Sequence, residues 1–216
     1  MSPTVFVIDD DAAVRDSLGR LLEAHRLHVR SYGSAEEFLG ALRPTASGCL
    51  VLDVRLPRMS GPDLQAALAS RGVRLPIIFL TAQGDVPTSV RALQAGALDF
   101  LEKPVAGDLL LDRVRAALRM EAKQRREQAQ LRRARARYVQ LTPREREVMG
   151  LLTAGHSSKE IARRLGISHR TVEIHRTRVM HKMRATNLIE LAAAAAACDG
   201  VPDSGSPDLR PAPKPS

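Results

Sequence analysis

Residues 5–11 have the sequence VFVIDDD, in which four apolar residues are followed at once by three carboxylates. Val and Ile favour extended backbone, and a run that is apolar at every position is typical of a strand buried on both faces. The first half of the chain contains four further short apolar runs, at Leu27–Val29, Cys49–Leu52, Ile77–Leu80 and Phe100–Leu101. We therefore predict five buried strands, of which Leu27–Val29 has the weakest pattern.

Helical patterns separate these strands. Apolar side chains recur at helical spacing between residues 14 and 22, and Ser34 with Glu37 forms a capping box before a second helix. Further helices are predicted near residues 62–70, 86–96 and 106–120. Neighbouring parallel strands need crossover connections, which these helices would supply, so the fold class is α/β with a five-stranded, doubly wound parallel sheet.

Polar side chains stand at the carboxyl ends of the predicted strands. Asp9 and Asp10 follow the first strand and Asp53 ends the third, while Thr81 ends the fourth and Lys103 the fifth. Ligands of such sheets bind at this edge, and clustered carboxylates repel one another unless a hard cation such as Mg²⁺ neutralises them. A hydroxyl and an ammonium can bind phosphoryl oxygens. The set predicts a site that transfers a phosphoryl group to a carboxylate.

Each of these residues also has a purely structural interpretation. An isolated Asp after a strand is usually a helix cap, and an isolated Lys or Thr is usually a surface residue. Matched residues at four strand ends are much harder to explain in this way. For Asp11, capping of the first helix remains a fair alternative to a role in the site.

The two halves of the chain differ in charge. Residues 1–118 contain 13 Lys and Arg against 14 Asp and Glu, and residues 119–216 contain 20 against 10, so the net charges are −1 and +10. Only the second half is a candidate for binding a polyanion. Aromatic residues make up 3% of the chain and Trp is absent, which favours duplex over stacked single strands.

Composition also argues against several other classes of protein. Cys49 and Cys198 lack the spacing of metal ligands or of a disulfide framework. The longest apolar run, Leu191–Cys198, is too short to span a bilayer, and the N-terminus lacks a signal-peptide pattern. We expect a soluble, cytoplasmic protein without a membrane partner.

The basic segment 119–136 consists of strong helix formers and is predicted to be a helical linker that continues the fifth helix. Its charges are better explained as a solvated face than as a dedicated binding site. Residues 200–216 are rich in Pro and are predicted to be a disordered tail.

Residues 137–199 show helical patterns only. Thr142, Pro143 and Glu145 form a helix start with a capping box, Gly155 follows the end of that helix, and Asn187 begins an Ala-rich last helix. Between these two helices, residues 158–177 have the pattern of a helix-turn-helix motif, whose second helix enters the major groove of DNA.

The second helix of this motif separates apolar from polar side chains. Val172, Val179 and Met183 form the buried stripe, opposite a face that can present Glu173 to cytosine, Ile174 to a thymine methyl and Arg178 to guanine. A charged helix in a bundle, with no DNA partner, would show the same separation. The predicted DNA-binding residues, including those suited to phosphates, are Arg170, Thr171, Glu173, Ile174, His175, Arg176, Thr177, Arg178 and Lys182.

Residues 4–118 resemble the receiver domain of two-component response regulators, a flavodoxin/CheY-like fold. The matching segments are VFVIDDDAAVRDSL, LVLDVRLPRMSGPDL and IIFLTAQGDVPTSVRALQAGALDFLEKP. The resemblance implies that Asp53 is the phosphoacceptor and that Asp9, Asp10, Asp53 and the backbone carbonyl of Arg55 hold Mg²⁺. It further implies that Thr81 and Lys103 contact the phosphoryl group and that Phe100 is a switch aromatic. Lys103–Pro104 matches a peptide bond that is often cis in the family. For Phe100 an ordinary place in the sheet core is the alternative.

Residues 137–199 resemble the LuxR-type DNA-binding domain, in the segment LTPREREVMGLLTAGHSSKEIARRLGISHRTVEIHRTRVMHKMRATNLIEL. A receiver followed by this four-helix, all-α domain is the NarL/FixJ arrangement, and GDVP, TVEIHR and VMHKM are most similar to its FixJ side. Ser158 departs from the family, which often has Asn there.

These resemblances imply a transcription regulator and not an enzyme, apart from catalysis of its own phosphorylation and dephosphorylation. A histidine kinase would phosphorylate Asp53, the protein would dimerise, and the helix-turn-helix would bind double-stranded DNA. RNA polymerase is a further candidate partner, and activation is expected by resemblance only.

Two other functions remain open from the sequence. The same fold could be a phosphate-independent DNA-binding regulator whose acidic residues are structural. The Asp9-x-Asp11 pattern is also similar to aspartyl-phosphate phosphatases of the haloacid dehalogenase type. That family has Thr or Val at the position of Ala13 and a further acidic pair after a later strand. The sequence has neither feature.

Overall fold

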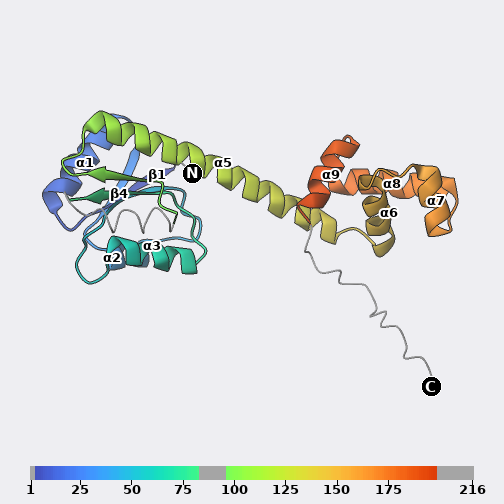
Figure 1. Ribbon diagram of the computed structural model, residues 1–216, viewed down its shortest axis with the longest axis horizontal. Helices are drawn as coiled ribbons and strands as arrows, with labels where there is room; N and C mark the ends of the chain where they lie inside the picture. Colours follow the sequence, from blue (N-terminus) through green and yellow to red (C-terminus); the bar gives the residue numbers. More distant parts are fainter. Residues whose placement is uncertain (1–2, 83–95, 199–216) are drawn as a thin grey trace, which may run out of the picture. The chain divides into compact units, whose positions relative to one another are not determined.

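The computed structural model describes residues 3–82 and 96–198. The chain divides into two compact units between Arg125 and Arg126 (Figure 1). The predicted helix at 86–96 and the predicted disordered tail at 200–216 lie outside the described residues, except for Gly96.

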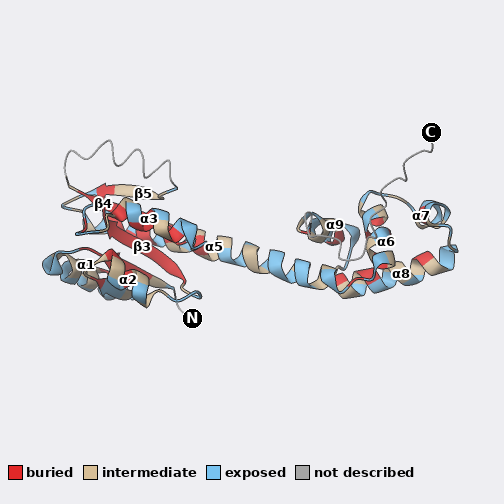
Figure 2. Ribbon diagram, turned by 90° about the horizontal axis from the view of Figure 1, so that it is seen from below, coloured by how far each residue is buried: buried red, intermediate tan, exposed pale blue. Residues whose placement is uncertain are grey.

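The first unit contains a parallel sheet with the strand order β2-β1-β3-β4-β5. Its strands are β1 (Thr4–Ile8), β2 (His28–Tyr32), β3 (Gly48–Asp53), β4 (Ile77–Thr81) and β5 (Asp99–Glu102). β3 is buried along its whole length (Figure 2), as the unbroken apolar run predicted. The predicted α/β fold with five parallel strands is confirmed. The edge strand β2 is not buried as predicted, because its outer side has no neighbouring strand and His28, Arg30 and Ser31 are exposed.

Four described helices cover the two faces of this sheet, and their side chains form two cores. They are α1 (Ala12–Ala24), α2 (Ala35–Ala41), α3 (Gly61–Ser70) and α5 (Gly107–Val139). α2 and α3 pack on the face that carries Phe6 and Ile8, whereas α1 and the first turns of α5 pack on the face that carries Val5 and Val7. Each strand thus divides its side chains between two cores, as the alternation of side chains along a strand requires.

The predicted helical linker is confirmed, because α5 continues from the receiver-like sheet to Val139 without interruption. The unit boundary at Arg125 falls inside this helix. The described basic side chains from Arg119 to Arg135 are exposed, in agreement with a solvated face.

The second unit adds four helices after α5. They are α6 (Pro143–Thr153), α7 (Ser158–Leu165), α8 (His169–Met183) and α9 (Leu188–Ala196). Val148, Leu152, Ile161, Val172 and Val179 meet in its core. This confirms the apolar stripe predicted for α8.

Capping side chains define where these helices begin, as the sequence indicated. Thr142 caps α6 in a capping box with Glu145, and Asn187 caps α9. In the structure Ser168 caps α8. The cap of α7 is Ser157, so Ser158 is the first helical residue and does not cap it. The unusual Ser158 therefore leaves the start of α7 intact. No helix in the described ranges is both long enough and apolar enough to cross a membrane.

Candidate functional site

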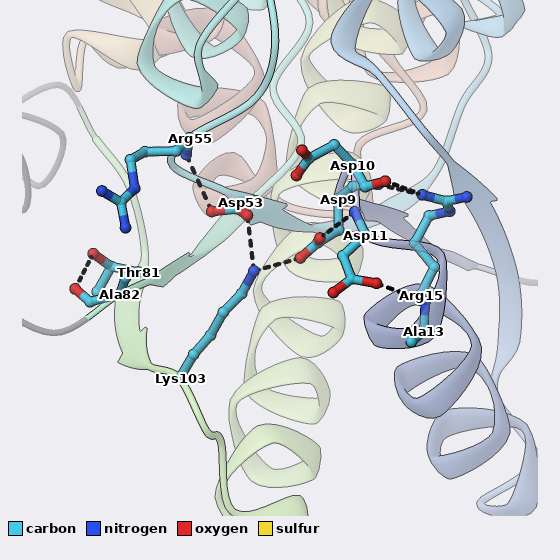
Figure 3. Close-up of polar contacts among 10 residues, drawn as sticks. All are labelled: Asp9, Asp10, Asp11, Ala13, Arg15, Asp53, Arg55, Thr81, Ala82 and Lys103. Atoms are coloured by element: carbon cyan, nitrogen blue, oxygen red, sulfur yellow. Dashed lines mark hydrogen bonds and ion pairs between the residues drawn. The ribbon is translucent and has the colours of Figure 1, made fainter.

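The carboxyl ends of β1, β3 and β5 bring Asp9, Asp53 and Lys103 together (Figure 3). β1 and β3 are adjacent in the sheet, and Lys103 directly follows β5, which ends one residue earlier than predicted. The Lys103 Nζ atom lies 2.6 Å from Oδ2 of Asp9 and 2.8 Å from Oδ2 of Asp53. The predicted cluster is therefore a hydrogen-bonded ionic site.

Burial and charge act against each other at this site. Burial raises the pKa of the Asp9 carboxyl above its usual value, and the hydrogen bonds from Lys103 and the Asp11 amide offset this only in part. For Lys103, burial acts to lower the pKa, but hydrogen bonds to Asp53 and Asp9 outweigh it and the pKa is raised. Lys103 is consequently a cation at neutral pH.

The turn after β1 is held by side chains of the first helix. Asp11 is the N-cap of α1 and accepts a hydrogen bond of 2.8 Å from the Ala13 amide. Arg15 donates to the carbonyl oxygens of Asp9 at 2.8 Å and Asp10 at 3.0 Å (Figure 3). The capping interpretation of Asp11 is confirmed. The role of Arg15 was missed, although its place one helical turn after the cap was a signal for it.

Three carboxylates of the site could share a cation. Asp9, Asp10 and Asp53 each offer an oxygen, and these oxygens lie within 4.8 Å of one another. Carboxylate oxygens are the ligands that Mg²⁺ prefers. The residues fit the predicted metal. The Arg55 amide donates to Oδ1 of Asp53 at 3.1 Å, while the predicted role of the Arg55 carbonyl stays a prediction.

The side chains of Thr81 and Phe100 make no hydrogen bond or ion pair with the carboxylates or the ammonium of the cluster in the described structure. The backbone carbonyl of Thr81 accepts a hydrogen bond of 2.8 Å from the Lys103 amide. Thr81 is buried, and its hydroxyl donates to the Ala82 carbonyl at 3.1 Å (Figure 3). Phe100 is half-buried and stacks on Phe79, with ring centroids 4.9 Å apart. Their predicted phosphoryl and switch roles stay predictions. The Lys103–Pro104 peptide bond is cis, as the resemblance implied.

The second unit presents the predicted DNA-binding face on α8. Arg170, Ile174, Thr177 and Arg178 are exposed, and Ile174 is 45% exposed despite being apolar. The Thr177 hydroxyl donates to the Glu173 carbonyl, within the same helix. An exposed apolar side chain between polar neighbours suits contact with a thymine methyl.

The other predicted DNA-binding residues flank this face and are half-buried. The Thr171 hydroxyl is 2.8 Å from that of Ser168, and Arg176 is 3.9 Å from the Glu173 carboxylate. His175 is half-buried. These contacts leave the predicted roles of the three residues untested.

Lys182 differs from the other predicted DNA-binding residues because its ammonium is bound inside the domain. Its Nζ atom lies 2.6 Å from Oε2 of Glu145, whose side chain is only 3% exposed. The phosphate contact predicted for Lys182 stays a prediction, but the structure offers it a protein partner. Glu145 was recognised as a capping residue, and its contact with α8 was missed because no local pattern joins positions so far apart in the sequence.

Protonation of Glu145 should weaken the second unit at low pH. Burial acts to raise the pKa of this carboxyl, but hydrogen bonds from Lys182 and Thr142 outweigh it, and the pKa is lower than its usual 4.5. The ion pair therefore stabilises the folded state fully above pH 4.5, and this stabilisation is lost as the pH falls through the lower pKa of the folded state. At neutral pH, Glu145→Gln should lower the free energy of unfolding of the second unit by about 2 kcal/mol, which is the usual contribution of a hydrogen bond to a charged group.

Urea unfolding of wild type and Glu145→Gln at several pH values checks this expectation. The chain has two tyrosines and no tryptophan, so a Tyr32→Phe background leaves the fluorescence of Tyr138 as a reporter of the second unit. The difference in free energy of unfolding should shrink as the pH drops below 4.5. A difference that is constant with pH would contradict an ionic contribution.

Comparisons with known proteins agree with both units. Residues 5–115 match the response regulator receiver domain, and residues 139–195 match the luxR family of bacterial regulatory proteins. The chain is 46% identical over 187 residues to the transcriptional regulatory protein FixJ of Azorhizobium caulinodans, covering 87% of this chain and 89% of FixJ. The chain belongs to the NarL/FixJ family of response regulators.

Other relatives of this response regulator give the same result. The transcriptional regulatory protein TdiR of Thauera aromatica is 47% identical over 180 residues, with 83% of this chain and 79% of TdiR covered. The solved structure of the response regulator StyR matches with a TM-score of 0.82 and 40% identity, over 91% of this chain and 99% of StyR. A receiver domain is thus combined with a LuxR-type DNA-binding domain for transcription regulation.

Proposed function

We propose that this response regulator is switched by phosphorylation of Asp53 by a histidine kinase. Phosphorylation would dimerise the protein and promote its binding to double-stranded DNA, where it would act as an activator, with RNA polymerase as a candidate partner. It would work in the cytoplasm, and its only catalysis would be its own phosphorylation and dephosphorylation. The observation that carries the proposal is the pairing of Asp53 with Lys103 at the carboxyl edge of the sheet.

Accessibility favours Asp53 over Asp9 as the phosphoacceptor. The Asp9 side chain is 1% exposed, whereas that of Asp53 keeps 12% of its surface. The Arg55 amide and Lys103 hold one oxygen each of the Asp53 carboxylate. An oxygen of Asp53 would bond to phosphorus as the bond from phosphorus to the histidine nitrogen breaks. Positioning of this kind is the main contribution that a protein makes to phosphoryl transfer.

The site also has groups that can bind the product. Asp9, Asp10 and Asp53 would hold Mg²⁺, which when bound would neutralise charge on the phosphoryl oxygens. Lys103 is already hydrogen-bonded to Asp53 and would stay beside the new phosphoryl group. The phosphorylated carboxylate adds acceptor oxygens, and one of these could draw the Thr81 hydroxyl away from the Ala82 carbonyl.

Movement of Thr81 would connect the site to the surface near β5. Thr81 and Glu102 pair in the register of β4 and β5, and Phe79 and Phe100 pair two residues earlier. Phe100 is the half-buried member of a stacked pair with Phe79, so its ring would be the one that moves outward. Phosphorylation would act as a population shift between two arrangements of this pair, favouring the one that dimerises.

Sedimentation velocity of the purified protein tests the proposal. With Mg²⁺ present, addition of beryllofluoride, which mimics an aspartyl phosphate, should convert monomer to dimer and raise the affinity for DNA. Asp53→Ala should abolish both effects because the acceptor oxygens are gone. The same response in wild type and Asp53→Ala would overturn the assignment of Asp53.

A regulator that does not depend on phosphate would behave differently. It would bind DNA tightly when unmodified, and neither beryllofluoride nor Asp53→Ala would change its sedimentation coefficient. This outcome would overturn the switch while leaving the DNA-binding domain intact.

A further inference from the structure

A buried ion pair joins the beginning of α6 to the end of α8. Oε2 of Glu145 accepts a hydrogen bond of 2.9 Å from the Thr142 amide and another of 2.6 Å from Nζ of Lys182. Glu145 belongs to the first turn of α6 and Lys182 to the last turn of α8. One carboxylate oxygen therefore closes the capping box of one helix and ties down the other.

The last turn of α8 is also attached to the end of α5. Nζ of Lys182 lies 3.3 Å from the Gln140 carbonyl, and Nη1 of Arg137 donates to the Met183 carbonyl at 3.2 Å. Cations at this position satisfy carbonyl groups that the helix leaves free and suit the negative end of its dipole. The C-terminal end of α8 is thus held from two neighbouring segments.

The direction of the Lys182 side chain separates it from the DNA-binding face. Helical periodicity places Lys182 between the exposed face with Ile174 and Arg178 and the buried stripe with Val179 and Met183. Its side chain is 32% exposed, so the stem lies over the domain while the ammonium reaches Glu145. Moving this ammonium to a DNA phosphate would leave the carboxylate of Glu145 buried without its cation, which is unfavourable.

We propose that Glu145 and Lys182 are positioning residues for DNA recognition. They orient α8 through the ion pair, and Lys182 acts through Glu145 instead of binding a phosphate. The inference rests on the DNA-binding function of the domain and concerns how its recognition helix is held. Small errors in the placement of a recognition helix misalign all of its base contacts at once, so specificity depends on the pair.

The effect of Glu145→Gln on DNA binding separates the two alternatives. If Lys182 binds phosphate, removal of the neighbouring negative charge leaves DNA affinity unchanged or raises it. If the pair positions α8, the affinity for a selected duplex falls about tenfold while the affinity for random duplex changes little. Gln still suits a capping box, so this variant keeps the start of α6.

The salt dependence of binding by Lys182→Met supplies a second readout. Each lost phosphate contact makes the slope of log K against log salt less steep by about 0.9. We expect Lys182→Met to weaken specific binding about tenfold with an unchanged slope. Arg170→Met is the matched control, because Arg170 is exposed at the start of α8 and should lower the slope as a phosphate contact does.

The experiment uses the full-length protein and a duplex selected from random sequence by the wild type, with and without beryllofluoride. A loss of affinity in both variants, smaller in the double variant than the sum of the single losses, supports the pair. A less steep slope for Lys182→Met, or unchanged specific binding by Glu145→Gln, overturns it.

A separate variant tests whether the predicted face of α8 contacts DNA. Arg178→Ala should weaken specific binding and relax the preference at one base position, without any effect on urea unfolding. Unchanged binding by Arg178→Ala would contradict the predicted base contact but not the ion pair. Loss of the beryllofluoride response alone would concern Asp53 and leave the inference about Glu145 and Lys182 standing.

Discussion

Replacing Lys103 with Met should make the stability of the receiver unit depend strongly on Mg²⁺. The change leaves the carboxylates of Asp9 and Asp53 facing each other, with side chains only 1% and 12% exposed and no ammonium between them. Removal of one partner from a buried ion pair costs about 3–5 kcal/mol. We expect the free energy of unfolding to fall by about 3 kcal/mol here, because the Lys103 side chain is 25% exposed and water screens part of its charge.

Thermal unfolding with and without Mg²⁺ measures this effect. A cation that binds only the folded state stabilises it, so Mg²⁺ should restore more stability to Lys103→Met than it adds to wild type. Arg113→Met is a matched control in the same unit, since the 2.8 Å pair of Arg113 with Asp99 is more exposed and should contribute about 0.5 kcal/mol. Equal stabilisation of wild type and Lys103→Met by Mg²⁺ would show that the cation binds elsewhere.

Replacing Gly48 with Ala should prevent the sheet of the receiver unit from forming. Gly48 has φ +142°, and a Cβ atom at this position would lie 1.7 Å from the carbonyl oxygen of Thr4. Gly48 pairs with Thr4 at the start of β1 and β3, two adjacent interior strands, so neither strand can move without breaking the ladder. We expect the free energy of unfolding to fall by more than about 4 kcal/mol, which is a large share of the stability of a domain.

Gly19→Ala is the matched control for this substitution. Gly19 lies inside α1, where an added Cβ atom would have no neighbour within 4 Å, and Ala there should stabilise the helix by about 0.5–1 kcal/mol. Urea unfolding of both variants, followed by Tyr32 fluorescence in a Tyr138→Phe background, gives the comparison. A Gly48→Ala protein that unfolds at the wild-type urea concentration would contradict the steric argument.

Patterns that act over a few residues were enough to predict most of the fold and part of the site. Fully apolar runs such as Val5–Ile8 identified the parallel strands, because only a sheet covered on both faces buries every side chain of a strand. Asp9 and Asp53 followed from the same pattern, since parallel topology brings the strand ends to one edge. Thr142 and Asn187 identified helix starts through local hydrogen bonds to the backbone.

Contacts between distant residues were decided by the tertiary structure alone. Sequence placed Thr81 at the correct strand end, but only packing determines that its hydroxyl meets the Ala82 carbonyl. Lys182 has the same charge and helical spacing as a phosphate-binding residue, and its ammonium turns to Glu145 because folding brings α6 against the end of α8. Local sequence therefore determined the elements and their ends, whereas the partners of long charged side chains depended on which elements the folded chain places side by side.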